Sequence, residues 1–315
     1  MTNQKTISSL VSFYATKLQN QKNINLTSRM GLSYFAAQFL SSCGEEECFR
    51  YIKSDIQAIV CDVLDVDKTY LYMYGNRELD ISAIAQIDEK MIRYRAGEPL
   101  AYLLGYKYFW DQKLKVTQDT LIPRADTEVL VQAVLDSILR ENAELRILDL
   151  GTGTGAIALA LAGELTNAQV AAVDCSAKAL EVAKENAISN DIRNVKFIQS
   201  DWYENLKGMK FDIIVSNPPY IDSNDNDIDA EVKAYEPASA LFAEDNGLAD
   251  IEIILSQAES FLMPKGSLYI EHGYAQSASV QTMFKKYGFA SIETIRDLGG
   301  KDRCSKAKKS FGEGW

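Results

Sequence analysis

The chain has 315 residues, 47% of them hydrophobic, which predicts one large or two ordinary domains with a substantial core. Its 33 basic and 44 acidic residues give a net charge of −11. That balance argues against general affinity for nucleic acid or an anionic membrane, because phosphate groups are bound by Lys and Arg. The first residues lack the apolar core of a signal peptide, and no run approaches the ~18 apolar residues of a membrane span. We therefore expect a cytoplasmic protein that acts neither on membranes nor directly on nucleic acid.

Five cysteines are spread along the chain. Their number is odd, and no two of them form a Cys-x-x-Cys pair. This pattern is typical of reduced thiols in a cytosolic protein, so we expect no disulfide framework and no metal site. The five residues are Cys43, Cys48, Cys61, Cys175 and Cys304.

The first third of the chain has the apolar spacing of amphipathic helices. Apolar residues recur at i, i+3, i+4 and i+7 within residues 7–18, 32–40 and 56–64. A further helix is expected over about 82–94. Together these patterns predict a helical domain over residues 1–95.

A different pattern follows the helical region. Glycines and prolines stand between aromatic and β-branched residues, which predicts a hairpin linker over residues 96–125. Over residues 126–315 strand and helix patterns alternate, one helix beginning after a Ser176 cap. Such alternation predicts an α/β domain whose mainly parallel sheet is covered by helices on both faces. The expected strands are 146–150, 168–174, 194–201, 211–216, 266–271 and 290–296, and the expected helices are 127–142, 154–165, 176–190, 249–262 and 275–287.

Three glycines, Gly151, Gly153 and Gly155, lie between a predicted strand and a predicted helix in the stretch LDLGTGTGAIALA. Glycine lets the main chain turn sharply and approach a ligand closely, and the amino terminus of a helix offers free amide donors. Similar glycines bind dinucleotides in dehydrogenases. The loop, with its Thr152 and Thr154, therefore indicates a nucleotide-like cofactor without identifying it.

Acidic residues end the three predicted strands nearest this loop. Asp149, Asp174 and Asp201 stand at carboxyl ends, where parallel sheets gather their ligands. Asp174 suits a ribose diol, and Asp201 suits an adenine amine whose ring Trp202 would cover. The alternative is that the acids are ordinary caps and turn formers, and that Trp202 belongs to the core or to a surface lid. The acids and the glycine loop together favour a cofactor site.

The stretch FDIIVSNPPYID ends a predicted strand with Asn217, Pro218, Pro219 and Tyr220. Proline cannot donate to a sheet, and it pushes the preceding residue out of the helical region, so Asn217 and Pro218 are both held extended. The Asn217 side-chain oxygen and the Pro218 carbonyl oxygen can then accept both hydrogens of one planar –NH2 group. The Tyr220 ring can pack flat against that group. The alternative is a proline-rich turn without chemistry.

Such a clamp suits methyl transfer to an amide or aromatic amine. The lone pair of that nitrogen is delocalised, which makes the nitrogen a poor nucleophile. Holding both hydrogens positions the nitrogen and favours a geometry in which its lone pair is available. A sulfonium methyl is already a strong electrophile, so positioning can supply most of the acceleration, and no general base is needed before transfer.

These residues resemble the class I methyltransferases that use S-adenosylmethionine and carry Asn-Pro-Pro-Tyr, which act on adenine or guanine amines and on glutamine amides. Other segments favour one family among these methyltransferases. Over roughly residues 50–303 the chain is similar to the HemK/PrmC family, whose members methylate the glutamine of the Gly-Gly-Gln tripeptide in peptide chain release factors. The segments are GEPLAYLLGYKYFW (97–110), LIPRADTE (121–128), DLGTGTGAIALALA (149–162), QSDW (199–202) and SNPPYID (216–222).

The resemblance implies a Rossmann-like class I methyltransferase sheet, preceded by a hairpin linker and a small helical domain that helps to hold the release factor. It implies S-adenosylmethionine as methyl donor, S-adenosylhomocysteine as product and the glutamine N5 as acceptor, in an enzyme that we expect to be monomeric. Gly151–Gly155, Asp174 and Trp202 would contact the cofactor, and Asn217 would meet both cofactor and glutamine. Pro218, Pro219 and Tyr220 would complete the substrate clamp, with Phe109 and Arg124 at its border.

Three features depart from the family pattern. Ala125 replaces a proline in PRADTE, which should loosen that turn, and about thirty residues at the start form an extension. After DLGGKDR the family closes with an apolar strand, but this chain reads CSKAKKSFGEGW. Because Lys306, Lys308 and Lys309 suit a central strand poorly, we expect the last strand to be distorted, weakly paired or missing.

Several interpretations stay open. His272 is either a hydrogen-bonded structural residue, which we favour, or a base. The acidic segment 222–250 is either a solvated loop or a flexible lid. The basic run 301–309 is typical of a solvated terminus, with RNA or an acidic partner surface as the alternative. Two other functions also remain: methyl transfer to an exocyclic amine of nucleic acid (adenine N6 or guanine N2), and a non-catalytic binding module of the translation machinery.

Overall fold

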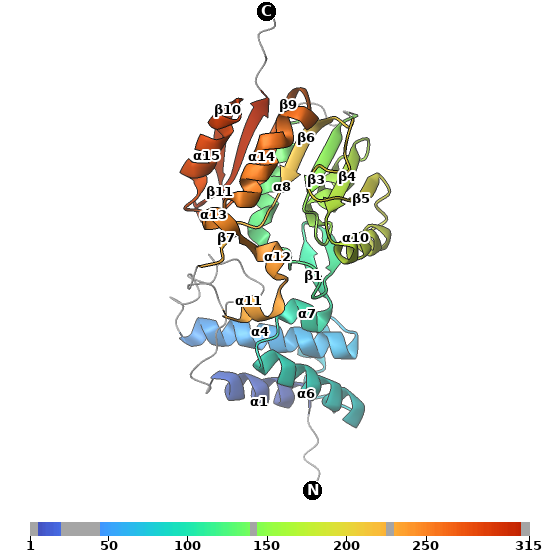
Figure 1. The fold of residues 1–315 in the computed structure, drawn as a ribbon. Coiled ribbons are helices and arrows are strands. Elements are labelled where there is room, and N and C mark those ends of the chain that lie inside the picture. Colours follow the sequence, from blue (N-terminus) through green and yellow to red (C-terminus); the bar gives the residue numbers. More distant parts are fainter. Residues whose placement is uncertain (1–5, 20–44, 139–143, 225–229, 310–315) are drawn as a thin grey trace, which may run out of the picture. The chain divides into compact units, whose positions relative to one another are not determined.

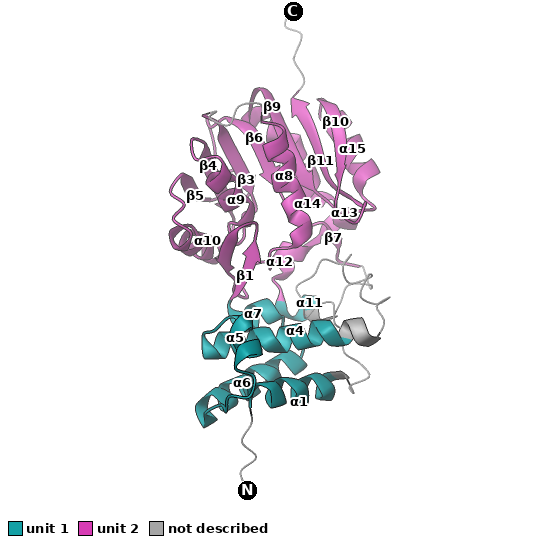
Figure 2. Ribbon diagram, turned by 180° about the vertical axis from the view of Figure 1, so that it is seen from behind, with its two compact units in different colours: residues 1–105, 228–235 teal, residues 106–227, 236–315 magenta. Residues whose placement is uncertain are grey.

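The computed structural model describes residues 6–19, 45–138, 144–224 and 230–309. The chain divides into two compact units, which Figure 2 shows in different colours. The helix predicted over residues 32–40 lies outside the described residues, and so does Cys43. Unit 1 consists of residues 1–105 and 228–235, and unit 2 consists of residues 106–227 and 236–315.

Unit 1 is helical. Its apolar core joins three helices, with Leu10 from the first, Ile56 from the second and Ile87 from the third all fully buried. Asp80 caps one of these helices by accepting a hydrogen bond from the Ala83 amide at 2.7 Å. The first helix falls within the predicted extension and contributes to the unit 1 core. The helices are α1 (Ile7–Gln19), α4 (Glu45–Leu64), α5 (Lys68–Met73), α6 (Ile81–Arg95), α7 (Leu100–Leu104) and α11 (Ala230–Tyr235).

The predicted hairpin opens unit 2. Strands β1 (Tyr106–Phe109) and β2 (Gln112–Lys115) pair antiparallel, and a two-residue turn joins them with Trp110 at φ 55°. Phe109 and Leu114 of the hairpin are buried in the core of unit 2.

A seven-stranded sheet forms the centre of unit 2 (Figure 1). Its strand order is β10-β11-β9-β6-β3-β4-β5, and the five strands from β9 to β5 are parallel. The predicted mainly parallel α/β fold is therefore confirmed, and the one strand that runs in the opposite direction is β11, between β9 and the edge strand β10. The strands are β3 (Arg146–Leu150), β4 (Gln169–Asp174), β5 (Val195–Gln199), β6 (Phe211–Ser216), β9 (Leu262–Glu271), β10 (Phe289–Arg296) and β11 (Asp302–Lys309).

Helices cover both faces of this sheet, as the alternating pattern predicted. Successive side chains of a strand point to opposite faces, so Ile147 of β3 packs in one core cluster and Leu148 in the other. The first cluster contains α8 (Glu128–Asp136) and α9 (Ala156–Glu164), with Ala187 of α10 (Ala177–Ser189). The second contains α14 (Ala249–Phe261) and α15 (Ser277–Lys286). Several shorter elements lie around the sheet: η1 (Ala125–Thr127), β7 (Ile221–Asp222), α12 (Ala238–Leu241), β8 (Phe242–Ala243) and α13 (Glu244–Gly247).

The carboxyl-terminal strand is present, which excludes a missing strand, and its register with β10 shifts at two places, which confirms the predicted distortion. β11 is a formed strand that pairs with β10 on one side and with β9 on the other. Cys304 and Ala307 carry the apolar contacts on its two faces, while Lys306 reaches Glu293 on β10 in a 2.9 Å ion pair. The basic run is therefore part of the sheet rather than a solvated tail. A strand with one small apolar residue on each face tolerates lysines whose ammonium groups reach its rim.

Candidate active site

The predicted site residues gather at one edge of the sheet. The chain runs from β3 outward through β4 to β5 and then returns to β6 on the other side of β3. Ligands of open α/β sheets bind at such a reversal, beside the carboxyl ends of the strands. The glycine loop follows β3, Asp174 ends β4, Asp201 follows β5 and the Asn-Pro-Pro-Tyr turn follows β6.

The glycine loop has the left-handed main chain that its glycines allow. Gly151, Gly153 and Gly155 have φ values of 71°, 55° and 85°. A Cβ atom on Gly155 would lie 3.2 Å from the Cβ of Ala183, which shows that α9 and α10 pack closely there. At Gly153 a Cβ would meet no atom within 4 Å. The loop is therefore open to a ligand at Gly153.

Asp174 fastens this loop to the end of β4. Its two oxygens accept hydrogen bonds from the amides of Gly153 and Ser176, each at 2.9 Å. Burial raises its pKa, and these two hydrogen bonds oppose the rise. The sequence predicted a carboxylate that binds a ribose. The structure shows that this carboxylate holds the loop, and ribose binding stays a prediction.

Asp149 is a fully buried acid beneath the loop. One of its oxygens accepts hydrogen bonds from the Thr152 hydroxyl at 2.6 Å and from the Ala158 amide at 3.2 Å. The other oxygen has no hydrogen-bond partner among the described residues. Burial raises the pKa of Asp149 to about 7. An unpaired buried carboxylate oxygen is costly and is satisfied best by a donor or a cation.

Trp202 lies over the first glycine of the loop. Its ring edge comes within 3.6 Å of where a Cβ atom of Gly151 would be. Its main chain is left-handed, with φ 42°, and its side chain hydrogen-bonds Asp250, whose pKa burial raises. Asp201 beside it is exposed. Trp202 thus lies next to the glycine loop and also packs against the core, and its contact with a cofactor stays a prediction.

The Asn-Pro-Pro-Tyr turn is held at both of its ends by side chains. The Asn217 amide nitrogen donates to the Thr127 hydroxyl at 3.1 Å, and the Tyr220 hydroxyl donates to Glu271 at 3.2 Å. Pro218 between them is buried and Pro219 is half-buried. No described residue donates a hydrogen bond to the Asn217 oxygen, which leaves that atom as an acceptor at the sheet edge.

The main chain of the turn is fixed from a third direction. The Gln276 side-chain nitrogen donates to the carbonyl oxygens of Tyr220 at 2.9 Å and Asn246 at 3.1 Å, while its oxygen accepts from the Gly273 amide at 2.9 Å. Strand β7 pairs with β8 just after the turn. The segment 222–250, predicted as a loop or lid, therefore contains short elements that hold the turn.

The sequence did not reveal a buried charge cluster behind the turn. Arg303 is 4% exposed and forms ion pairs with Asp126 at 3.2 Å and Asp297 at 3.1 Å. Glu271 is 1% exposed, and burial raises its pKa to about 7. Asp126 lies in the segment LIPRADTE, and Asp297 and Arg303 lie in DLGGKDR. Both segments follow the family pattern, and this agreement was the sign in the sequence that the three residues matter.

Two other residues named in the sequence analysis, His272 and Arg124, have polar partners within the fold. His272 is fully buried, and its Nδ1 lies 2.9 Å from the Gly273 carbonyl oxygen, so Nδ1 carries the hydrogen. Its Nε2 then accepts from the Ser305 hydroxyl at 2.8 Å, which confirms the favoured hydrogen-bonding role. Arg124 pairs with the buried Glu236, which also accepts from the Ile122 amide at 3.1 Å.

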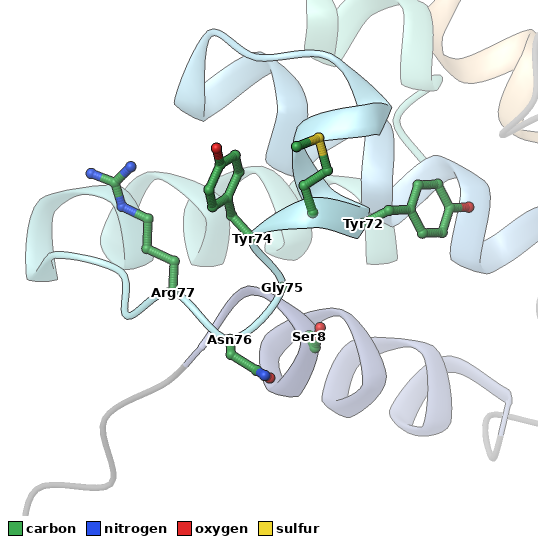
Figure 3. Close-up of a pocket in the computed structure, with 7 residues that line it drawn as sticks. Ser8, Tyr72, Tyr74, Gly75, Asn76 and Arg77 are labelled. Atoms are coloured by element: carbon green, nitrogen blue, oxygen red, sulfur yellow. The ribbon is translucent and has the colours of Figure 1, made fainter.

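A pocket of about 400 Å³ lies in unit 1 (Figure 3). In that view the side chains of Tyr74 and Arg77 extend in a similar direction, and the Tyr72 side chain points away from both. The predicted site residues all belong to unit 2, so this pocket is not the predicted site. Among the described residues no group of three or more His, Cys, Asp or Glu side chains could hold a metal ion. No described helix is long and apolar enough to cross a membrane.

The sheet, with its glycine loop and Asn-Pro-Pro-Tyr turn on one edge, defines a class I methyltransferase. Residues 141–309 match the methyltransferase domain family, and residues 35–105 match the PrmC N-terminal domain. The chain belongs to the PrmC/HemK family of release factor glutamine methyltransferases, which confirms the resemblance seen in the sequence.

Three similar proteins illustrate the match. The release factor glutamine methyltransferase of Francisella tularensis subsp. tularensis is 57% identical over 86% of this chain and 96% of its own length. That of Vibrio cholerae is 46% identical over 80% of this chain and 87% of its own length. Among solved structures, the protein-(glutamine-N5) methyltransferase (release factor-specific) of Alicyclobacillus acidocaldarius is 27% identical over 62% of this chain and 99% of that chain, with a TM-score of 0.39.

Proposed function

We propose that this protein transfers a methyl group from S-adenosylmethionine to the side-chain nitrogen, N5, of the glutamine in the Gly-Gly-Gln motif of peptide chain release factors. The observation that carries the proposal is the orientation of Asn217. Its nitrogen donates to Thr127, so its oxygen is turned away from Thr127 and can accept a hydrogen from a substrate amide.

The turn suits a planar –NH2 acceptor. Asn217 and Pro218 each offer an oxygen acceptor, and the two prolines remove main-chain freedom between them. Binding both amide hydrogens holds the nitrogen in place and reduces the entropy lost on reaction. The Tyr220 hydroxyl is occupied by Glu271, so the Tyr220 ring is fixed and can pack against the amide plane.

The chain's residues fit the proposed cofactor. The unpaired Asp149 oxygen suits a cationic group, and Gly153 leaves room for a ligand to approach the main chain. We propose that Gly151–Gly155, Asp174, Asp201, Trp202 and Asn217 bind the cofactor, and that Asn217, Pro218, Pro219 and Tyr220 bind the glutamine. When bound, S-adenosylmethionine supplies an electrophilic sulfonium methyl group, and S-adenosylhomocysteine is the product.

The proposed partner is a protein. The relatives' names specify release factors, and the net charge of −11 disfavours nucleic acid as the acceptor. We propose that the domain predicted over residues 1–95 helps to hold the release factor. We also propose a monomer in the cytoplasm, where Cys61, Cys175 and Cys304, the cysteines whose side chains are described, would stay as the free thiols seen here.

Transfer of labelled methyl groups tests the proposal. The purified protein is incubated with labelled S-adenosylmethionine and either a release factor or its variant with the Gly-Gly-Gln glutamine replaced by alanine. We expect label on the first and none on the second. Equal labelling of both, or labelling of RNA or DNA alone, would contradict it and favour another acceptor.

A further inference from the structure

Gln276 joins the Asn-Pro-Pro-Tyr turn to two other segments of unit 2. Its side-chain nitrogen donates to the Tyr220 carbonyl oxygen at 2.9 Å and to the Asn246 carbonyl oxygen at 3.1 Å. Its side-chain oxygen accepts from the Gly273 amide at 2.9 Å. The side chain is half-buried and stands at the amino terminus of α15. One side chain thus connects the last residue of the turn with α13 and with the residues that follow β9.

These hydrogen bonds determine which end of the Gln276 side chain faces the turn. A glutamine side chain donates hydrogens only from its nitrogen and accepts them only at its oxygen. The Gly273 amide is a donor and therefore requires the oxygen, whereas the two carbonyl groups are acceptors and require the nitrogen. With the side-chain amide reversed, every contact would join two donors or two acceptors, at a cost in free energy. The neighbours of Gln276 therefore hold its nitrogen against the turn.

Tyr220 is held both at its side chain and at its main chain. Its hydroxyl donates to Glu271 at 3.2 Å, and its carbonyl oxygen accepts from Gln276. A rotation of the peptide group that follows Tyr220 would break the Gln276 hydrogen bond and leave the Glu271 hydrogen bond in place. Gln276 therefore fixes the main chain at the end of the turn where Glu271 fixes a side chain.

The main chain from Tyr220 back to the Pro218 carbonyl group has little freedom. Its peptide bonds are planar, and the ring of Pro219 holds φ at about −65°. The rotatable dihedrals between the Pro218 and Tyr220 carbonyl groups are ψ of Pro219 and φ and ψ of Tyr220. The two hydrogen bonds of Tyr220 restrict the last two of these dihedrals. The direction of the Pro218 carbonyl group therefore depends on the contact with Gln276.

We propose that Gln276 is a positioning residue for methyl transfer: by holding the Tyr220 carbonyl group it directs the Pro218 carbonyl oxygen at the acceptor amide. The inference rests on the proposed function, and Gln276 acts through the turn rather than on the substrate. If the Pro218 oxygen swings away, the acceptor nitrogen is held at a poorer angle and its lone pair no longer lines up with the methyl group.

Substitutions at Gln276 and at one control position separate this role from a merely structural one. Gln276→Met keeps the length of the side chain and removes all of its hydrogen bonds. Gln276→Glu places a carboxylate against two carbonyl oxygens, and Gln276→Lys restores a donor for them without an acceptor for Gly273. Gln281→Met is the matched control, because Gln281 is also half-buried on α15 but donates to the Thr294 hydroxyl at 2.8 Å rather than to the turn.

Each variant is assayed for kcat, for the KM of the release factor, for cofactor Kd by calorimetry and for Tm. The kinetic assays are run well below the lowest Tm, so that unfolded protein does not lower the rate. The Tm of Gln276→Met and that of Gln281→Met should both fall, because each substitution removes side-chain hydrogen bonds. A fall in kcat should distinguish the two.

We expect Gln276→Glu to lower kcat by roughly 100-fold and Gln276→Met by at least about tenfold, the scale on which misplaced groups lose activity. Gln276→Lys should be at least about threefold faster than Gln276→Met, because it restores the donor to the Tyr220 carbonyl group. The KM of the release factor and the cofactor Kd should change by no more than about threefold, because Gln276 contacts neither ligand. Gln281→Met should keep kcat within about threefold of native.

A kcat within about threefold of native for both Gln276→Glu and Gln276→Met would overturn the inference, as would an equal kcat loss in Gln281→Met. A raised KM or cofactor Kd with native kcat would also overturn it, because Gln276 would then serve binding rather than positioning. A Gln276→Lys variant no faster than Gln276→Met would overturn the role of the donor. Absence of transfer by the native protein would instead count against the proposed function, so the two failures are distinguishable.

Discussion

Gly247 lies so close to Tyr220 that a Cβ atom on Gly247 would stand 2.1 Å from the Tyr220 carbonyl oxygen. Gly247 is also left-handed, with φ 79°, and so are Asp245 and Asn246 before it. Gln276 donates to the same Tyr220 oxygen at 2.9 Å. The last residue of the proposed substrate clamp is therefore positioned by main-chain contact with a segment that contains no predicted site residue.

Substituting Gly247 by alanine should displace the Tyr220 main chain and lower kcat by at least about tenfold. Gly208→Ala is a matched control, because Gly208 has φ 80° but a Cβ there meets no atom within 4 Å. Both substitutions place alanine in the left-handed region at a cost of about 1 kcal/mol. Only the first adds a clash. We therefore expect Gly247→Ala to have a lower free energy of unfolding in urea and a lower kcat than Gly208→Ala. Indistinguishable values for the two variants would show that the contact does not position the turn.

Asn217→Ala should abolish methyl transfer while largely sparing cofactor binding. The substitution removes the acceptor oxygen for the substrate amide and the donor to Thr127. We expect kcat to fall by at least about 100-fold, measured as label transfer, while the cofactor Kd from calorimetry rises by no more than about tenfold. Asn190→Ala, which loses side-chain hydrogen bonds to main-chain oxygens at the end of α10, is the control. Retained turnover by Asn217→Ala would refute the clamp.

Asp174→Ala should weaken cofactor binding. The carboxylate holds the Gly153 and Ser176 amides, and both charge-assisted hydrogen bonds would be lost together with the proposed ribose contact. We expect the cofactor Kd to rise by more than about tenfold. Asp212→Ala removes a comparable hydrogen bond to the Arg146 amide at the opposite end of the strands. An equal change in cofactor Kd for the two variants would contradict the assignment.

Glu271 should make stability depend on pH. Its pKa is raised from an ordinary 4.5 to about 7, so the folded state binds the proton more tightly than the unfolded state. Its favourable contribution is therefore present below about pH 4.5 and is lost as the pH rises to about 7. The loss amounts to about 3 kcal/mol. Glu271→Gln cannot titrate, so the free energy of unfolding of the variant minus that of the native protein should increase across this range.

Urea denaturation of both proteins at a series of pH values from 4.5 to about 8 measures that difference. Groups that titrate alike in the two proteins cancel in the subtraction. A difference that stays constant with pH would mean that the pKa of Glu271 is not raised by burial.

Much of the fold could be predicted from local pattern. The apolar stretch FDIIVS forms β6 over the predicted residues, and the Ser176 side chain accepts from the Ala179 amide at 3.2 Å, as the cap predicted. The glycine loop and the Asn-Pro-Pro-Tyr turn were recognisable because each needs particular residue types at fixed spacing. Their placement on one sheet edge followed from the rule that parallel strands share a direction.

The remaining features depend on contacts between distant segments. Nothing near Glu271 in the sequence indicates that it meets Tyr220, or that Arg303 pairs with Asp126. The sequence left open whether β11 forms a regular strand, because its lysines taken alone argue against a central position in a sheet. Its pairing on both sides and the ion pair between Lys306 and Glu293 emerge only when β9 and β10 flank it.

The most direct test is to locate the methyl group. A release factor is incubated with the protein and S-adenosylmethionine, digested, and analysed by tandem mass spectrometry, with Asn217→Ala protein as the blank. We expect one added methyl group on the side-chain nitrogen of the Gly-Gly-Gln glutamine, present with the native protein and absent with the variant. A methyl group on any other residue, or an unmodified glutamine after incubation with active protein, would contradict it.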